Sequence, residues 1–284
     1  MKFSICIPTL SEREKSLNRA IESIEKQSYK NFEIILIWKG DKEPLVAHYG
    51  YSLRIKKQES DSVAGAINEG LALATGDVFV RTDDDCIFDA YWLENMKNTY
   101  EKFPNTIGVT GVSSVPKDRM SNRDVFKQFP LLVERIVWEG QRMRIGKHFK
   151  SGATSIGSDY ALSWDVPGCM AVDFMQNCNW SMRIEKIREY GGFPERYGGL
   201  SEYCQEIALY KRKSHELLIW NPNAIVYHMV ESSDSRRLHA FNRLKNFWMF
   251  WHECIKPNGG SYPRFLFYFM LQAGYYLCKK LRLI

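Results

Sequence analysis

Residues 78–88 form the stretch from which the rest of the chain can be interpreted: Val78-Phe79-Val80-Arg81-Thr82-Asp83-Asp84-Asp85-Cys86-Ile87-Phe88. The apolar run at its start predicts a short strand that ends just before three consecutive aspartates. In open α/β sheets, ligands bind at the carboxyl ends of the strands. Adjacent carboxylates repel one another, so a cluster that is even half-buried needs a cation, and Mg²⁺ or Mn²⁺ carrying a diphosphate suits oxygen ligands. A solvated acidic turn is the alternative for such a triplet taken alone.

The composition is that of a globular protein with unevenly distributed charge. The chain has 284 residues, of which 45% are hydrophobic and 25% charged, and its formal net charge is +6. Residues 235–284 contain nine Lys or Arg and one acid, so they carry +8 and leave −2 for residues 1–234. A basic, aromatic segment of this kind can attract nucleic acid or an anionic membrane surface. No RNA- or DNA-binding motif accompanies it, so we expect no nucleic-acid partner.

The cysteines point to a reducing environment. Seven are scattered along the chain, and no two have the spacing of a CxxC motif. This pattern argues against a disulfide framework or a zinc site. The apolar run within residues 1–8 is too short for a signal peptide. We therefore expect a cytoplasmic protein, peripheral on the cytoplasmic face of a membrane.

Strand and helix patterns alternate over the first part of the chain. We expect strands at 3–7, 32–38, 53–57 and 78–81, with helices at about 13–27 and 63–74 between them. This order predicts a mostly parallel, doubly wound α/β sheet flanked by helices. Further along, we expect strands at 107–115, 217–220 and 224–227, helices at 179–190 and 202–213, and a mobile loop at about 140–166.

The C-terminal segment predicts helices with an apolar side. Residues 236–255 have apolar side chains at helical spacing, and a second apolar run covers residues 265–278. Fourteen residues are too few to span a bilayer. Tyr and Trp beside Lys and Arg favour a helix lying in the membrane interface. The alternative is a helix docked on the rest of the protein.

Four stretches together resemble the family 2 glycosyltransferases, which are inverting enzymes of the GT-A fold. The likeness covers about residues 3–228, and its order and spacing are more specific than any single piece. It implies a nucleotide-sugar-binding half at 1–110, an acceptor-binding half at 111–234 and a helical extension at 235–284. The stretches are Ser4-Ile5-Cys6-Ile7-Pro8-Thr9; Gln27 with Glu33-Ile34-Ile35-Leu36; Asn68–Asp77 leading into Asp83-Asp84-Asp85; and Asn179–Arg183 with Gly191–Glu195, Glu202 and His228.

The resemblance implies a divalent cation, Mn²⁺ or Mg²⁺, that stabilises the departing diphosphate of a nucleotide sugar. Asp85, the last residue of the family's DxD motif, is the expected direct ligand. His228 is the expected second ligand, because the family often places a histidine there. Asp83 is expected to hold the ribose or a metal-bound water. The alternative for His228 is an ordinary histidine at a strand end.

Glu202 is the expected catalytic base. The family carries this base at the same point, often within a Glu-Asp pair, but here Tyr203 replaces the second acid. Glu206 is the second choice, because residues i and i+4 share a helix face. The alternative for Glu202 is an acid at a helix start, favoured there by the helix dipole.

The remaining site residues are assigned by position. We expect the donor to contact Pro8, Thr9, Glu12, Trp38, Asn68, Asp83 and Asp84. The family usually has a nucleobase-reading Asp after its second strand, but this chain has Trp38-Lys39-Gly40-Asp41, so the nucleobase stays open. Asp173 and Asn179 are expected on the acceptor or sugar side.

The expected function is transfer of a sugar from a nucleotide diphosphate to a hydroxyl of a lipid-linked or polysaccharide precursor. One rival is a sugar-nucleotide pyrophosphorylase, which needs a glycine-rich basic loop after its first strand. Residues 8–13 contain no glycine. The other rival is a non-catalytic carbohydrate- or lipid-binding relative, consistent with the missing nucleobase Asp and with Tyr203.

Overall fold

The computed structural model describes residues 1–46, 50–114, 129–155, 168–175, 177–197, 213–229 and 240–280. The chain divides into two compact units, Met1–Asn122 with Ser158–Glu231 and Arg123–Gly157 with Ser232–Ile284. The segments expected from the sequence, 1–110, 111–234 and 235–284, stay predictions, because they divide the chain by function rather than by contacts.

The first unit contains one sheet whose first four strands are parallel. They are β1 (Phe3–Leu10), β2 (Phe32–Lys39), β3 (Ser52–Lys57) and β4 (Val78–Arg81), in the spatial order β3-β2-β1-β4. β1, β2 and β4 are buried on both faces along nearly their whole length. This burial explains their uninterrupted apolar sequences.

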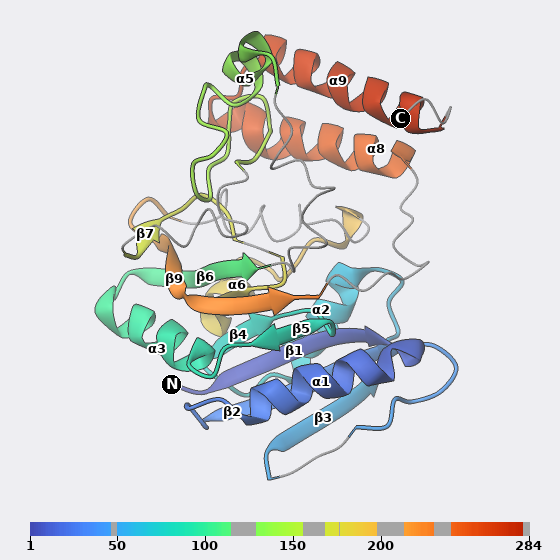
Figure 1. Ribbon diagram of the computed structural model, residues 1–284, viewed down its shortest axis with the longest axis vertical. Coiled ribbons are helices and arrows are strands. Elements are labelled where there is room, and N and C mark those ends of the chain that lie inside the picture. Colours follow the sequence, from blue (N-terminus) through green and yellow to red (C-terminus); the bar gives the residue numbers. More distant parts are fainter. Residues whose placement is uncertain are drawn as a thin grey trace. The chain divides into compact units, whose positions relative to one another are not determined.

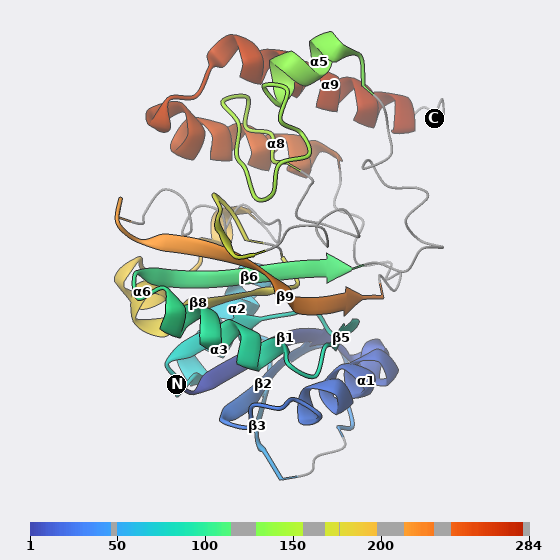
Figure 2. The same cartoon turned by 60° about the vertical axis from the view of Figure 1, so that its left-hand side comes forward.

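Helices cover both faces of this sheet (Figure 1 and Figure 2). α1 (Glu14–Glu25), which follows the 3₁₀ turn η1 (Ser11–Arg13), and α3 (Trp92–Lys102) pack on one face. α2 (Val63–Leu73) and α6 (Ile184–Glu189) lie on the other. Gly70 lets α2 approach β1 closely, since a Cβ there would lie 2.4 Å from the sulfur of Cys6. The helices expected at 13–27 and 63–74 are both present, as α1 and α2.

The remainder of the sheet is mixed. β8 (Trp180–Arg183) lies antiparallel between β4 and β6 (Thr106–Ser114), so the prediction of a helix over 179–190 is wrong for its first turn. β8 forms hydrogen bonds with β4 on one side and β6 on the other, and this pairing outweighs the local preference for helix. Strand formation depends on neighbouring strands more than on intrinsic propensity. Only the end of the expected helix, α6, is helical.

One long strand replaces the two short ones expected at 217–220 and 224–227. β9 (Leu217–His228) runs parallel to β6, with an irregular register between Gly111 and Val112. Pro222 cannot donate to a ladder, and a bulge accommodates it. Beyond the bulge, β9 pairs antiparallel with β5 (Cys86–Phe88), while β7 (Met170–Ala171) pairs with its first half.

The second unit is helical. α8 (Ala240–Phe250) continues into a π-helical turn, η7 (Trp251–Ile255), then η8 (Lys256–Asn258), and α9 (Tyr262–Lys280) runs beside α8 (Figure 1). Trp251 stacks on Phe265 with ring centroids 4.1 Å apart. α5 (Leu131–Val137) is held to α9 by Arg264, which donates to two α5 carbonyls. No helix among the described residues is both long and apolar enough to cross a membrane.

Part of the loop expected to be mobile, at 140–166, has a packed interior. Phe149 and Ala153 are 2% exposed and form a small core with Val137 and Trp138. The hydroxyl of Ser151 donates to the carbonyl of Val137. Residues 156–166 lie outside the described part of the chain.

Glu33 is a buried carboxylate whose contribution to stability can be tested. It accepts hydrogen bonds from Ser4 Oγ (2.6 Å), Thr75 N (2.7 Å) and Lys2 Nζ (3.1 Å). Burial alone would raise the pKa of Glu33, but these donors lower it from 4.5 to about 2. Because the folded pKa is the lower one, the carboxylate stabilises the fold above pH 4.5, and this stabilisation is lost as the pH falls toward 2.

We predict that Glu33→Gln lowers the free energy of unfolding by about 2 kcal/mol at pH 7. The deficit should shrink as the pH falls from 4.5 toward 2, measured by urea unfolding. Glu22→Gln, at an exposed Glu22–Lys26 pair, is the control and should change little. A deficit that stays constant with pH would contradict this account of Glu33.

Candidate functional site

The ends of β4 and β9 and the start of β5 bring the expected site together. Asp83, Asp84 and Asp85 follow the end of β4. β5 begins at the next residue and pairs with β9, which places Cys86 directly opposite His228. The aspartates therefore lie in the link between β4 and β5, and the histidine at the end of β9 faces Asp83 and Asp85.

Two of the aspartates and the histidine form a compact cluster with one cysteine. His228 Nε2 lies 3.2 Å from Asp85 Oδ1 and 3.7 Å from Asp83 Oδ2. One ligand atom from each of Asp83, Asp85, Cys86 and His228 lies within 4.8 Å of the others. The carboxylate of Asp85 is fully buried, and that of Asp83 is 28% exposed. The structure thus brings together the three residues predicted to hold a cation.

Two arginines that sequence analysis did not single out pair with the same aspartates. Arg13, from η1, lies 3.2 Å from Asp84 Oδ1 and 2.9 Å from Asp85 Oδ2. Arg81 lies 2.7 Å from Asp83 Oδ1 and also donates to the carbonyl of Asn177. The signal for Arg81 was its place at the end of an apolar strand, because a buried arginine needs an acidic partner. Arg13 carries no comparable signal.

Burial and neighbouring charges shift the pKa values of this cluster. Burial raises the pKa of Asp84 to about 6, against the lowering effects of the Thr9 hydroxyl and of Arg13. Burial disfavours a charged His228 ring, but Cys178 and the Asp85 carboxylate outweigh it and raise the pKa of His228 to about 11. A divalent cation in the cluster would compete with this proton, because a metal-bound imidazole is neutral.

The residues present fit a divalent cation. Carboxylate oxygens and an imidazole nitrogen are ligands that Mn²⁺ accepts, and the oxygens suit Mg²⁺. Nε2 of His228 is buried and faces the carboxylate oxygens of both Asp85 and Asp83. A cation would use this nitrogen and would relieve the repulsion between Asp83 and Asp85.

The predicted donor residues are spread over neighbouring elements. Thr9, near the end of β1, donates to Asp84 Oδ2 at 2.7 Å, and Pro8 precedes it. Glu12 is exposed in η1. Trp38, near the end of β2, is 6% exposed, and the ammonium of Lys57 lies 5.0 Å from its ring.

Two residues predicted to contact substrate, Asn68 and Asn179, form hydrogen bonds that stabilise the fold. Asn68 exchanges hydrogen bonds of 2.8 Å with both backbone groups of Phe193. Asn179 is fully buried, donates to the carbonyls of Val112 and Ala224, and accepts from the indole of Trp92. The side-chain amides of Asn68 and Asn179 therefore form hydrogen bonds within the protein. Sequence position alone could not distinguish this use from substrate contact.

The other predicted residues are less defined. Asp173 is half-buried and follows β7. Glu202 and Glu206, the first and second choices for the catalytic base, both lie outside the described residues.

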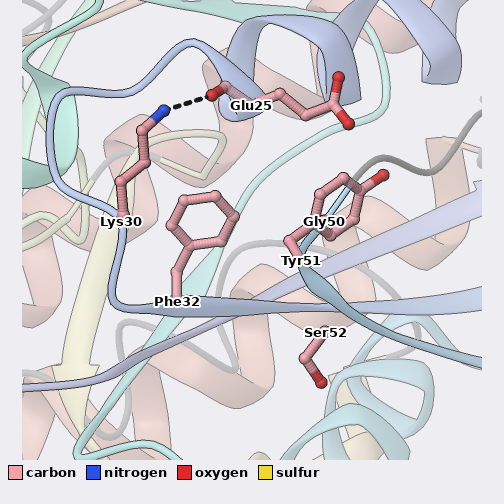
Figure 3. A pocket seen from close by; sticks show the side chains of 6 residues that line it. All are labelled: Glu25, Lys30, Phe32, Gly50, Tyr51 and Ser52. Atoms are coloured by element: carbon pink, nitrogen blue, oxygen red, sulfur yellow. Dashed lines mark hydrogen bonds between the residues drawn. The ribbon is translucent and has the colours of Figure 1, made fainter.

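A separate cavity of about 420 Å³ lies at the opposite edge of the sheet (Figure 3). It is bordered by the starts of β2 and β3, at Phe32 and Ser52, and by the end of α1, at Glu25. Lys30 Nζ donates to the carbonyl of Glu25 across its rim (Figure 3). This cavity is distinct from the aspartate cluster.

Comparison with known proteins decides the family. The model of "Glycosyl transferase family 2" matches residues 4–218. The chain belongs to this family. A glucosyl-dolichyl phosphate glucuronosyltransferase of Haloferax volcanii is 27% identical over 180 residues, covering 58% of this chain and 54% of that protein. The amylovoran biosynthesis glycosyltransferase AmsB of Erwinia amylovora is 26% identical over 278 residues, covering 91% and 79%. This family member thus spans about half the length of the Haloferax relative.

Solved structures show the same fold. GalNAc-T7, solved with UDP, GalNAc and Mn²⁺, has a TM-score of 0.62 at 15% identity, over 89% of this chain and 48% of that one. The mannosyltransferase PcManGT of Pyrobaculum calidifontis, solved with GDP-Man and Mn²⁺, has a TM-score of 0.55 at 17% identity, over 93% and 66%. The predicted GT-A-like α/β fold is confirmed.

We predict that Asp85→Ala abolishes Mn²⁺ binding, because the variant loses the buried carboxylate between Arg13 and His228. Isothermal titration with Mn²⁺ measures this. Asp77→Ala is the matched control, because Asp77 precedes the other end of β4 and binds the backbone of Lys2. Equal loss in both variants, or retained binding in Asp85→Ala, would contradict the assignment.

Proposed function

We propose that this protein is a metal-dependent inverting glycosyltransferase that transfers a sugar from a nucleotide diphosphate to a hydroxyl group. The observation that carries the proposal is the cluster of Asp83, Asp85 and His228 at the carboxyl edge of a family 2 sheet. The family assignment favours a transferase over a pyrophosphorylase. Two structural neighbours were solved with Mn²⁺ and a nucleotide or nucleotide sugar, which supports the same class of donor.

The cation site would be formed by Asp85 and His228, with Asp83 as a direct or water-mediated ligand. A bound Mn²⁺ or Mg²⁺ would neutralise charge that builds up on the diphosphate as it leaves. Arg13 and Thr9 bind Asp84 and would thereby restrain the loop after β4. The restrained loop would present Asp85 without reorganisation when the donor binds.

Further donor contacts are proposed from position. Pro8, Thr9 and Glu12 lie on β1 and the turn after it, and Trp38 is near the end of the neighbouring strand. Lys39 next to it would meet a phosphate, although it now pairs with Asp61 at 3.2 Å. Asp173 remains a candidate for sugar or acceptor contact. Asn68 and Asn179 are proposed to position the elements around the site.

Glu202 is the proposed base that takes the proton from the acceptor hydroxyl. In a direct displacement one carboxylate suffices, and no covalent sugar-enzyme intermediate forms. Because Tyr203 replaces the second acid of the family pair, Glu202 and Glu206 are the two acids left in this part of the chain that could serve.

We predict that wild-type protein hydrolyses or transfers sugar from at least one member of a nucleotide-sugar panel only when Mn²⁺ or Mg²⁺ is present. Glu202→Gln should lower kcat by about 10²–10⁴-fold and leave nucleotide binding by titration unchanged. Glu206→Gln is the comparison and should retain activity. Nucleotide binding that ignores Mn²⁺, without turnover, would instead identify a non-catalytic relative.

The acceptor is proposed to be lipid-linked or to be a polysaccharide precursor at a membrane surface. The Haloferax and Erwinia relatives have names that refer to dolichyl phosphate and to amylovoran biosynthesis. In the second unit, α9 exposes Leu266, Met270 and Leu277, at 43%, 63% and 57%. Residues four or seven apart share a helix face, so these form an outward apolar stripe. With the +8 charge of residues 235–284, the stripe suits the interface of an anionic membrane.

We predict that replacing Leu266, Met270 and Leu277 by Gln lowers binding to phosphatidylglycerol-containing vesicles more than tenfold, because each buried side chain contributes about 1 kcal/mol. Vesicle sedimentation measures this, and deletion of residues 261–284 should release the protein completely. Leu45→Gln is the control, since Leu45 is 65% exposed in the first unit. Unchanged sedimentation of the triple variant would remove the membrane proposal and leave the donor chemistry intact.

A further inference from the structure

Cys86 is the one member of the cluster at the end of β4 that sequence analysis did not assign. Its sulfur is grouped with ligand atoms of Asp83, Asp85 and His228, all within 4.8 Å of one another. The position follows from the fold. Cys86 is the residue after Asp85, and antiparallel pairing of β5 with β9 puts it directly across from His228. Cys86 is 1% exposed, so solvent does not compete for its sulfur.

The spacing suits a single ion. Bonds from divalent cations to oxygen, nitrogen or sulfur are about 2.0–2.6 Å long, so two ligands on opposite sides of one ion lie about 4–5 Å apart. The four ligand atoms already lie within this spread. Three of the ligands are oxygens or nitrogen, and the fourth is a sulfur.

We propose that Cys86 supplies a sulfur ligand to the cation site and makes this site bind thiophilic divalent ions such as Co²⁺, Zn²⁺ and Cd²⁺ more tightly than its oxygen and nitrogen ligands alone would. The inference rests on the proposed function, because it concerns the same cation site. Thiolates select softer metals, whereas Mg²⁺ depends on oxygen ligands. Cys86 would therefore determine which ion the protein prefers.

Binding through sulfur needs the thiolate. As the metal–sulfur bond forms, the S–H bond breaks and the proton passes to solvent.

Cys178 provides a matched control for this proposal. Its thiol lies 3.0 Å from the hydroxyl of Ser113 and interacts with both Cys86 and His228. Like Cys86 it is buried, at 4% exposed. Cys178 is not among the residues whose ligand atoms form the cluster.

The test is a spectroscopic titration of the full chain with Co²⁺ alone, because cobalt bound to a thiolate has an intense near-ultraviolet charge-transfer band. We expect this band in the wild-type protein and in Cys178→Ser, and its absence in Cys86→Ser and Cys86→Ala. Cd²⁺ affinity should fall by at least about tenfold in both Cys86 variants, which is the smaller loss typical even for residues that only hydrogen-bond to a metal ligand. Mn²⁺ affinity should change by less. Circular dichroism and thermal unfolding verify that each variant is folded.

Other results would overturn the proposal. A band that persists in the folded Cys86 variants, or that disappears only in Cys178→Ser, would rule out Cys86 as the sulfur ligand. Co²⁺ binding that gives no such band but disappears in Asp85→Ala would show a core role for Cys86 and leave the proposed function standing. Co²⁺ binding independent of Asp85 would count against both proposals.

Discussion

The repulsion among three adjacent carboxylates at the end of β4 is the constraint on which the site depends. Asp84 and Asp85 are almost completely buried, and a buried negative charge is costly unless it is paired. Arg13 pairs with both of them and His228 pairs with Asp85, while Arg81 pairs with the neighbouring Asp83. The positive groups surround the aspartates but leave the imidazole nitrogen of His228 facing two carboxylates. This arrangement both tolerates the triplet and keeps it available to a cation.

The order and direction of the strands bring the residues of this site to one edge of the sheet. The parallel strands β1 and β4 bring Thr9 and the aspartates to the same edge. β8 then reverses direction between β4 and β6, and the bulge beside Pro222 lets β9 follow β6 before it pairs with β5. Without this last antiparallel pairing, His228 would not be held opposite Cys86. Asn179 stabilises the same region, because its amide joins β8 to the backbones of β6 and β9.

Much of this arrangement could be predicted from the sequence where it depends on local patterns or on a family motif. The parts that depend only on contacts between distant segments could not be predicted. The strands expected at 3–7, 32–38 and 78–81, which correspond to β1, β2 and β4, and the helices α1 and α2 could be predicted because their patterns are local. The cluster of Asp83, Asp85 and His228 was found because it matches a family motif. β8 was predicted as helix, because Trp180–Arg183 is buried on both sides and shows no alternation. The pairing of Arg13 with two aspartates and the bracing roles of Asn68 and Asn179 depend on contacts between distant segments, which no local pattern records.

Diffraction at the manganese absorption edge, from crystals grown with Mn²⁺ and a nucleotide diphosphate, would locate the ion. We expect one strong anomalous peak within bonding distance of the Asp85 carboxylate and His228 Nε2, with the diphosphate against it. A nucleotide bound elsewhere, or bound at this edge of the sheet with no manganese between it and Asp85, would show that these residues do not hold the cation.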